Sequence, residues 1–160
     1  MNHRIENLPQ KKLIGNRTKM SFAQNMTFEL WNGFMKRRGE LSFKISEDLF
    51  SLQIYPPLFF QYFDPNSEFE KWAAVEVENF DEVPADMHTL ILESGLYAVF
   101  IYKGLPDNAS DTFRYILGEW MSQSGFTLDD RPHFEILGEK YKHDSSDSEE
   151  EIWIPLKAKE

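Results

Sequence analysis

The sequence contains no cysteine, so disulfide bonds and thiolate catalysis are excluded. Long apolar runs are missing as well: no stretch approaches the ~18 residues that a membrane-spanning helix needs. The N-terminal segment, Met1–Glu6, lacks the apolar core of a secretory signal peptide. From these absences we expect a soluble, cytoplasmic protein that does not contact a membrane.

Positive charge is scarce, with 17 Lys and Arg against 27 Asp and Glu and a formal net charge of −10. A surface that binds nucleic acid needs clustered Lys and Arg to neutralise phosphates. The densest basic run, Lys36–Arg38, lies at the end of an expected helix, where positive charge stabilises the helix dipole. No helix-turn-helix pattern precedes the first expected strand. The sequence therefore predicts no direct nucleic-acid binding.

Motifs for metal, phosphate and nucleophilic chemistry are also absent. The four histidines are scattered along the chain, without the spacing of metal ligands. The glycines are isolated, so there is neither a phosphate-binding loop nor a nucleophile elbow. We therefore expect no metal site, no cofactor and no catalytic residue. A paired-carboxylate mechanism through Glu70 and Glu151 stays open if both face one groove.

Large aromatic side chains, by contrast, are abundant. The chain has 14 Phe and 4 Trp, and 41% of its 160 residues are hydrophobic. A chain of this length suits a single folded domain, spanning residues 1–160. So many rings exceed what a small core needs, which is compatible with an aromatic-lined pocket. A Phe-rich core is the alternative explanation.

Two parts of the chain resemble each other, about residues 1–80 and about residues 87–157. In each part an apolar strand precedes an amphipathic helix, and further strands follow it. The offset between them drifts from roughly 85 to 81 residues, as expected if insertions fall in loops. The matching segments are residues 12–17 and 96–102, 27–38 and 112–124, 49–55 and 133–137, and 70–72 and 151–153.

This repeat predicts an α+β fold, in which two β-α-β-β modules are related by a pseudo-two-fold axis. Hairpin-rich connections indicate an antiparallel sheet, with both helices on one face and a ligand groove between the halves. Alternation along the last strand would place Ile152 and Ile154 beneath the helices. Glu151 and Trp153 would then point to the opposite face, which we expect to be open.

Several motifs in the second half follow one another in a recognisable order: Leu96–Gly104, Gly118–Trp120, Ser124–Gly125, Pro132–Glu135 and Glu151–Lys157. Each motif is loose by itself. Their order and spacing together resemble GyrI-like domains, the effector-binding domains of AraC-type and drug-sensing MerR-type regulators. The resemblance covers essentially the whole chain and is clearest over residues 87–157. The chain looks like a standalone member without DNA-binding helices.

The resemblance implies two β-α-β-β units with a groove between them that binds bulky, often cationic, aromatic compounds. It also implies an acidic ligand contact at the start of the last strand, here Glu151. A shift of one residue would bring Glu149 or Glu150 there instead. Ring faces attract cations, and an ionised carboxylate in an aromatic cavity is costly until a cation pairs with it. The other predicted ligand-binding residues are Glu70, the counterpart of Glu151 in the first half, and Trp153, Trp72, Trp120 and Phe113.

Three functions fit these expectations. The first is non-catalytic binding or sequestration of aromatic or cationic small molecules in the groove. The second is a hydrolase of electrophilic cyclopropane-bearing toxins, with Glu151 activating water. The third is modulation of a protein partner, such as DNA gyrase or a regulator, through the acidic surface. The resemblance favours the first.

Overall fold

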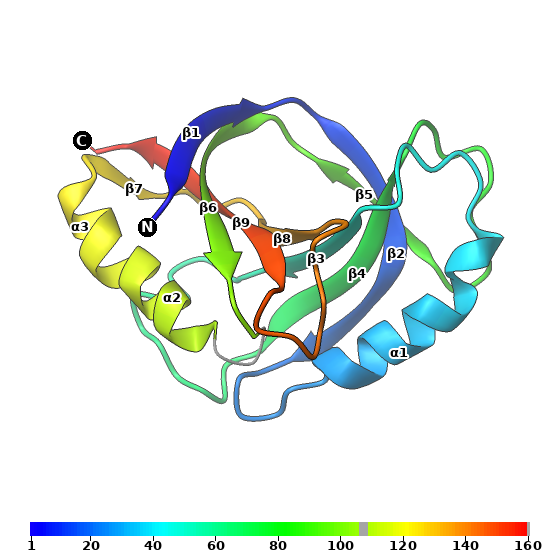
Figure 1. The fold of residues 1–160 in the computed structure, drawn as a ribbon, viewed down its shortest axis with the longest axis horizontal. Helices are drawn as coiled ribbons and strands as arrows, with labels where there is room; N and C mark the ends of the chain where they lie inside the picture. Colours follow the sequence, from blue (N-terminus) through cyan, green and yellow to red (C-terminus); the bar gives the residue numbers. More distant parts are fainter. Residues whose placement is uncertain (106–108, 160) are drawn as a thin grey trace.

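The computed structural model describes residues 1–105 and 109–159. Helices and strands alternate much as the repeat predicts (Figure 1). None of the helices in these residues is long and apolar enough to cross a membrane. In chain order the elements are β1 (His3–Leu8), β2 (Lys11–Met20), α1 (Thr27–Arg37), η1 (Arg38–Glu40), β3 (Leu49–Ile54), β4 (Phe69–Val77), β5 (His88–Leu92), β6 (Gly95–Lys103), α2 (Ser110–Tyr115), η3 (Ile116–Trp120), α3 (Met121–Gln123), β7 (Phe126–Leu128), β8 (His133–Leu137) and β9 (Glu149–Ala158).

The strands form one antiparallel sheet in the order β1-β6-β9-β8-β3-β4-β2-β5, and β7 pairs with β9. The order reads symmetrically from the central β3–β8 pair outward, so β4 and β2 of the first half correspond to β9 and β6 of the second. This confirms the α+β fold with a duplicated β-α-β-β module. The pseudo-two-fold axis passes through the β3–β8 pair, where the two halves meet.

The first strand of each half, β1 or β5, pairs with the edge of the other half. β1 pairs with β6, and β5 pairs with β2, so β5 and β6 do not form a hairpin with each other although they are consecutive in the chain. Leu8 of β1 pairs with Gly95 of β6, and Lys11 of β2 pairs with Leu92 of β5. The connection between β1 and β2 therefore lies beside the connection between β5 and β6. The β1–β2 segment and the β5–β6 segment therefore run side by side and form an arch over the side of the sheet that the helices leave free (Figure 1).

Alternation along the strands divides the core between the two faces of the sheet. On one face, α1 covers a cluster that includes Val75 and Val77 of β4. The helical segment α2–α3 covers Ile152 and Ile154 of β9, as predicted. On the other face, Trp153 belongs to a cluster with residues from both halves and is only 4% exposed. The expectation of an open second face was wrong, because the arch closes that face and aromatic side chains fill it.

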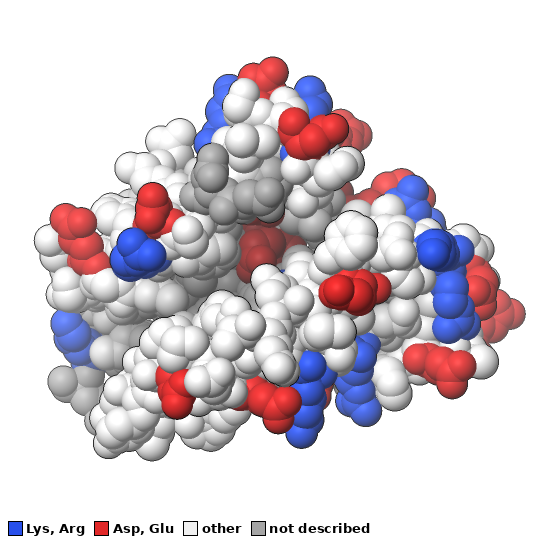
Figure 2. All heavy atoms as spheres, turned by 90° about the horizontal axis from the view of Figure 1, so that it is seen from below, with Lys and Arg blue, Asp and Glu red and all other residues white. Residues whose placement is uncertain are grey.

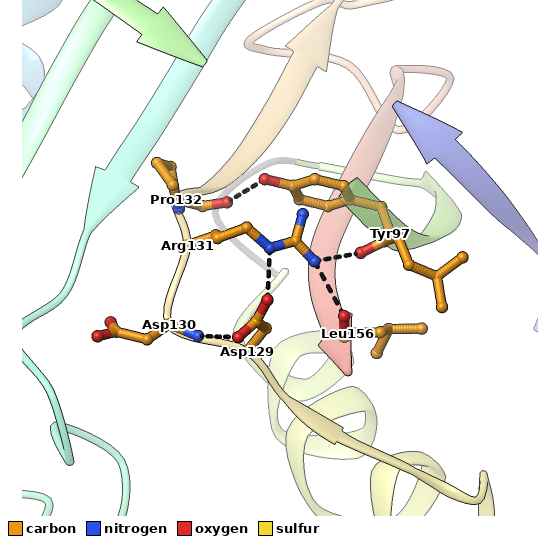
Figure 3. Close-up of polar contacts among 7 residues, drawn as sticks. Tyr97, Asp129, Asp130, Arg131, Pro132 and Leu156 are labelled. Carbon is orange, nitrogen blue, oxygen red and sulfur yellow. Dashed lines mark hydrogen bonds and ion pairs between the residues drawn. The ribbon is translucent and has the colours of Figure 1, made fainter. Parts of the chain in front are cut away.

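Arg131, in the connection between β7 and β8, fastens the end of this closed face (Figure 3). Its Nε donates to Asp129 Oδ2 at 2.6 Å, and its Nη2 donates to the carbonyls of Leu96 (2.7 Å) and Leu156 (2.9 Å). Its guanidinium lies 4.8 Å from the centre of the Tyr97 ring. The Tyr97 hydroxyl in turn donates to the Pro132 carbonyl at 2.8 Å. One side chain thus ties together β6, β9 and the loop before β8.

Candidate functional site

A groove of about 870 Å³ lies on the helix side of the sheet, between α1 and α2. Each helix covers the outer strands of its own half, so neither covers the central strands. Figure 2 looks onto this side of the molecule and shows acidic atoms recessed in a hollow between largely uncharged surfaces. The groove lies where the two halves meet, as the repeat predicts.

The floor of the groove carries polar side chains where the neighbouring helix-side positions are apolar. Ser51 of β3 and Glu135 of β8 are directly opposite partners in the central strand pair. Lys71 of β4 and Glu150 of β9 lie on either side of them and complete the floor. Lys71 lies two residues before Ala73 on β4, and Glu150 lies two residues before Ile152 on β9. Residues two apart on a strand point to the same face, so all four polar residues face the helix side.

Glu135 is the most deeply placed acid of the floor, with only 9% of its surface exposed. Gln53 Nε2 donates to its Oε1 at 3.3 Å. Its Oε2 is buried without a hydrogen-bond partner in the described part of the chain. Burial raises the pKa of this carboxyl, while Lys71 and the Gln53 hydrogen bond act in the opposite direction. The floor therefore holds a carboxylate oxygen that nothing in these residues satisfies.

Lys71 and Glu150 are electrostatically coupled to Glu135. Burial lowers the pKa of Lys71, against the effect of the two nearby carboxyls. Burial and the charge of Glu135 raise the pKa of Glu150 to about 7, although Lys71 opposes this shift. Two acids and one amine thus share a poorly solvated space. Near neutral pH, Glu150 exists in both its protonated and its ionised form.

The walls of the groove are largely apolar and come from both halves. Helix α1 contributes Phe28, Trp31 and Met35, and α2 contributes Phe113. Phe28 is 77% exposed. Leu49, Leu137, Tyr141 and His143 line the groove near the ends of β3 and β8, and Asn25, Thr27, Glu29, Asn32 and Ala109 also contribute to it. Acids at the floor beneath aromatic walls form a site suited to a bulky cation.

Of the six residues predicted to bind the ligand, only Phe113 lines this groove. Trp72 and Trp153 point to the opposite face and are buried in its aromatic core. Their indole nitrogens donate to Glu70 Oε1 at 2.5 Å and Glu151 Oε1 at 3.1 Å, respectively. Each acid thus serves as a hydrogen-bond partner of the tryptophan two residues along its own strand.

Glu151 and Trp120 also lie away from the groove. Glu151 is tied to Arg4 of β1, whose Nη2 lies 3.2 Å from Glu151 Oε2. Trp120 packs edge-on against Phe100, with ring centres 5.0 Å apart, and against His3. Among the three consecutive glutamates at the start of β9, it is Glu150 that lines the groove. The ligand role of Glu151 stays a prediction, and its geometry indicates a structural one.

Sequence reasoning missed Glu135 and Lys71 and named Glu150 only as an alternative to Glu151, although a signal was present. Lys71 lies on the same face of β4 as Ala73 and Val75, the face that packs beneath α1. Glu150 likewise lies on the same face of β9 as Ile152 and Ile154. A charged residue that continues an apolar stripe marks the point where the covering helix ends.

Comparison with known proteins places this groove in a family context. The sequence profile of the GyrI-like small molecule binding domain matches residues 1–157. The transcriptional regulator BrlR of Pseudomonas aeruginosa is 24% identical over 157 residues, which are 98% of this chain. Those residues are 56% of BrlR, so the chain spans little more than half the length of this relative.

Solved structures share the fold. SAV2435, determined with bound tetraphenylphosphonium, superposes with a TM-score of 0.75 at 20% identity, over 98% of this chain and 94% of that one. A protein from Listeria innocua described as a hydrolase, encoded by lin2189, superposes with a TM-score of 0.60 at 13% identity, over 97% and 91% of the two chains. At these identities the likeness shows a common fold.

Proposed function

The chain belongs to the GyrI-like small molecule binding domain family, and we propose that it binds bulky lipophilic cations in the groove between α1 and α2. Glu135 and Glu150 supply the negative charge at the floor, and aromatic side chains from both helices enclose the apolar body of the ligand. Binding in this proposal requires no chemical step.

The unsatisfied Oε2 of Glu135 is the observation that carries this proposal. A buried ionised carboxylate is costly unless it is paired. A cation that enters the groove brings a positive charge close to this oxygen, so its binding offsets part of an existing electrostatic penalty. The faces of Trp31 and Phe113 add cation–π attraction of roughly 0.5–2 kcal/mol each. A volume of about 870 Å³ lies within the usual range of ligand pockets.

The similarity to SAV2435 supports the same class of ligand, because that protein was determined with tetraphenylphosphonium. This compound is a permanent cation surrounded by phenyl rings. It cannot donate a hydrogen bond, so its recognition depends on charge and ring contacts, which the groove provides. Tetraphenylphosphonium is therefore a suitable probe for this chain.

Calorimetric titration with tetraphenylphosphonium tests the proposal. We expect Glu135→Gln to weaken binding by about tenfold or more, since the loss of a paired buried charge typically costs over 1.4 kcal/mol. Glu151→Gln is the matched control: it makes the same change on the opposite face and should leave the affinity unchanged. Loss of binding in Glu151→Gln alone would overturn this placement and restore the site predicted from the sequence.

A hydrolase acting on electrophilic small molecules is the second candidate, and the raised pKa of Glu150, about 7, favours it. A carboxyl with a pKa near the working pH is suited to general acid–base catalysis. The fold shared with the hydrolase encoded by lin2189 is compatible with this function. Turnover of a cyclopropane-bearing electrophile that is lost in Glu150→Gln, but kept in Glu151→Gln, would establish it. Absence of product under enzyme excess would remove it.

A further inference from the structure

We propose that Lys71 is a covalent attachment site in the groove, where its amine forms an imine with uncharged aromatic aldehydes. This inference rests on the proposed function only in that the groove must admit an aromatic ligand. It adds a reaction, and a class of ligand, that cation binding does not require.

The position of Lys71 sets it apart from other lysines of the chain. It lines the groove and is only 5% exposed. Within the described residues, no hydrogen bond or ion pair holds its ammonium group, whereas Lys11 lies 3.3 Å from Glu76 and Lys44 lies 3.3 Å from Glu47. Lys36 and Lys103 are exposed to solvent. Lys71 thus combines burial, access to a ligand-sized cavity and the absence of a fixed partner.

An amine attacks a carbonyl only in its neutral form, and the surroundings of Lys71 favour that form. Burial removes the water that stabilises an ammonium ion, so the pKa of Lys71 lies below its usual range. Glu135 and Glu150 act against this shift, but burial is the larger effect. Desolvation of this kind is a recognised way to activate a lysine for Schiff-base formation.

The reaction balances with groups already on the floor. The Lys71 nitrogen attacks the aldehyde carbon, a C–N bond forms, and the carbonyl oxygen takes a proton from Glu150. The nitrogen then gives a proton to the resulting carboxylate, which leaves a neutral carbinolamine. Glu150 returns its proton to the hydroxyl group, the C–O bond breaks, water leaves, and the nitrogen lone pair completes the C=N bond. Loss of the remaining nitrogen proton to Glu150 gives the imine, so the net change is aldehyde plus amine to imine plus water.

The walls select the kind of aldehyde. Trp31, Met35 and Phe113 present apolar surface to the groove, which favours a flat aromatic body. The carbonyl group must reach the floor, and an uncharged aldehyde leaves the balance between Lys71 and the two acids undisturbed. A two-ring compound such as 2-naphthaldehyde meets these requirements.

Reductive trapping tests the inference with the intact protein. The protein is incubated with 2-naphthaldehyde and sodium cyanoborohydride at pH 7, and peptide mass spectrometry then locates the naphthylmethyl group. We expect at least about tenfold more modification at Lys71 than at Lys36 or Lys103, because a positioned and neutral amine reacts faster. Modification at Lys71 no greater than at these two exposed lysines would overturn the inference.

Two controls identify the groove as the place of reaction. Excess tetraphenylphosphonium should protect Lys71 and leave the labelling of Lys36 unchanged. Lys71→Arg keeps the positive charge but removes the reactive amine, so it should lose the groove label alone, while Glu150→Gln should slow labelling severalfold. If tetraphenylphosphonium binds but Lys71 stays unlabelled, the covalent site is wrong and cation binding stands. If Lys71 is labelled but the cation does not bind, the proposed function fails and the covalent site stands.

Discussion

Ser51 and Glu135 face each other across the two central strands of the sheet, one from each half of the chain. The fold is nearly symmetric at this point, but the chemistry is not, because one half supplies a hydroxyl group and the other a carboxyl group. The same holds beside them: Lys71 corresponds to Ile152 in the other half, and Glu150 to Phe69. The charges of the groove floor therefore lie where the two copies differ.

Binding of a permanent cation should strengthen as the pH rises through 7. Protonated Glu150 has no charge to offer, and its pKa is raised to about 7 by burial and by Glu135. Below pH 7 we expect the affinity for tetraphenylphosphonium to fall by up to about tenfold per pH unit, as protonation competes with the cation. Calorimetry between pH 5.5 and 8.5, in steps of about half a unit, measures this dependence.

The variant Glu150→Gln isolates the source of that pH dependence. It should bind more weakly at pH 8 and show a flat profile across the same range. Two other buried ionisable groups on the groove floor, Glu135 and Lys71, also have shifted pKa values. An unchanged profile in Glu150→Gln would assign the dependence to one of these groups and contradict the role given to Glu150.

Arg131 should contribute to stability and leave ligand binding unaffected. Its substitution by Met removes the bonds to Asp129, Leu96 and Leu156 at the end of the closed face (Figure 3). We expect a loss of about 2–4 kcal/mol in the free energy of unfolding, since the partners of a largely buried charge are left unpaired. Chemical denaturation measures this loss. Arg114→Met, which breaks an exposed pair with Asp111, should change stability by less than about 0.5 kcal/mol.

Gly15 should tolerate no side chain, because β2 passes close to β4 at this point. A Cβ atom at Gly15 would lie 2.0 Å from the Ala73 carbonyl oxygen and 2.7 Å from the Ala74 Cα, and neither backbone atom can move aside easily. Gly15→Ala is therefore expected to cost about 3 kcal/mol or more of stability. Gly33→Ala in α1 is the matched control, since nothing lies within 4 Å of its new methyl group. Helix propensity predicts a gain of roughly 0.5–1 kcal/mol there, so equal losses in both variants would refute the steric argument.

The fold was more predictable than the site for a physical reason. Apolar periodicity and the repeat report on burial, and burial determines the sheet, the two helices and their common face. The repeat also drew attention to what the copies share, such as Trp72 with Trp153 and Glu70 with Glu151. In the structure these residues form matching tryptophan–carboxylate bonds in the closed face, far from the groove. The charged floor depends on where each helix ends over the sheet, which periodicity alone does not reveal.

Phe113 is the predicted ligand-binding residue that does line the groove, and it offers a direct test of the aromatic wall. The substitution Phe113→Leu keeps an apolar side chain but removes the aromatic ring. The free energy of tetraphenylphosphonium binding should therefore become less favourable by about 0.5–2 kcal/mol. Trp120→Phe is the control from the same helical segment, because Trp120 packs on Phe100 and His3 and not in the groove. It should lower stability and leave the affinity unchanged. If Trp120→Phe weakens binding while Phe113→Leu does not, the ligand lies beneath the helical segment α2–α3, and the groove between α1 and α2 is not its site.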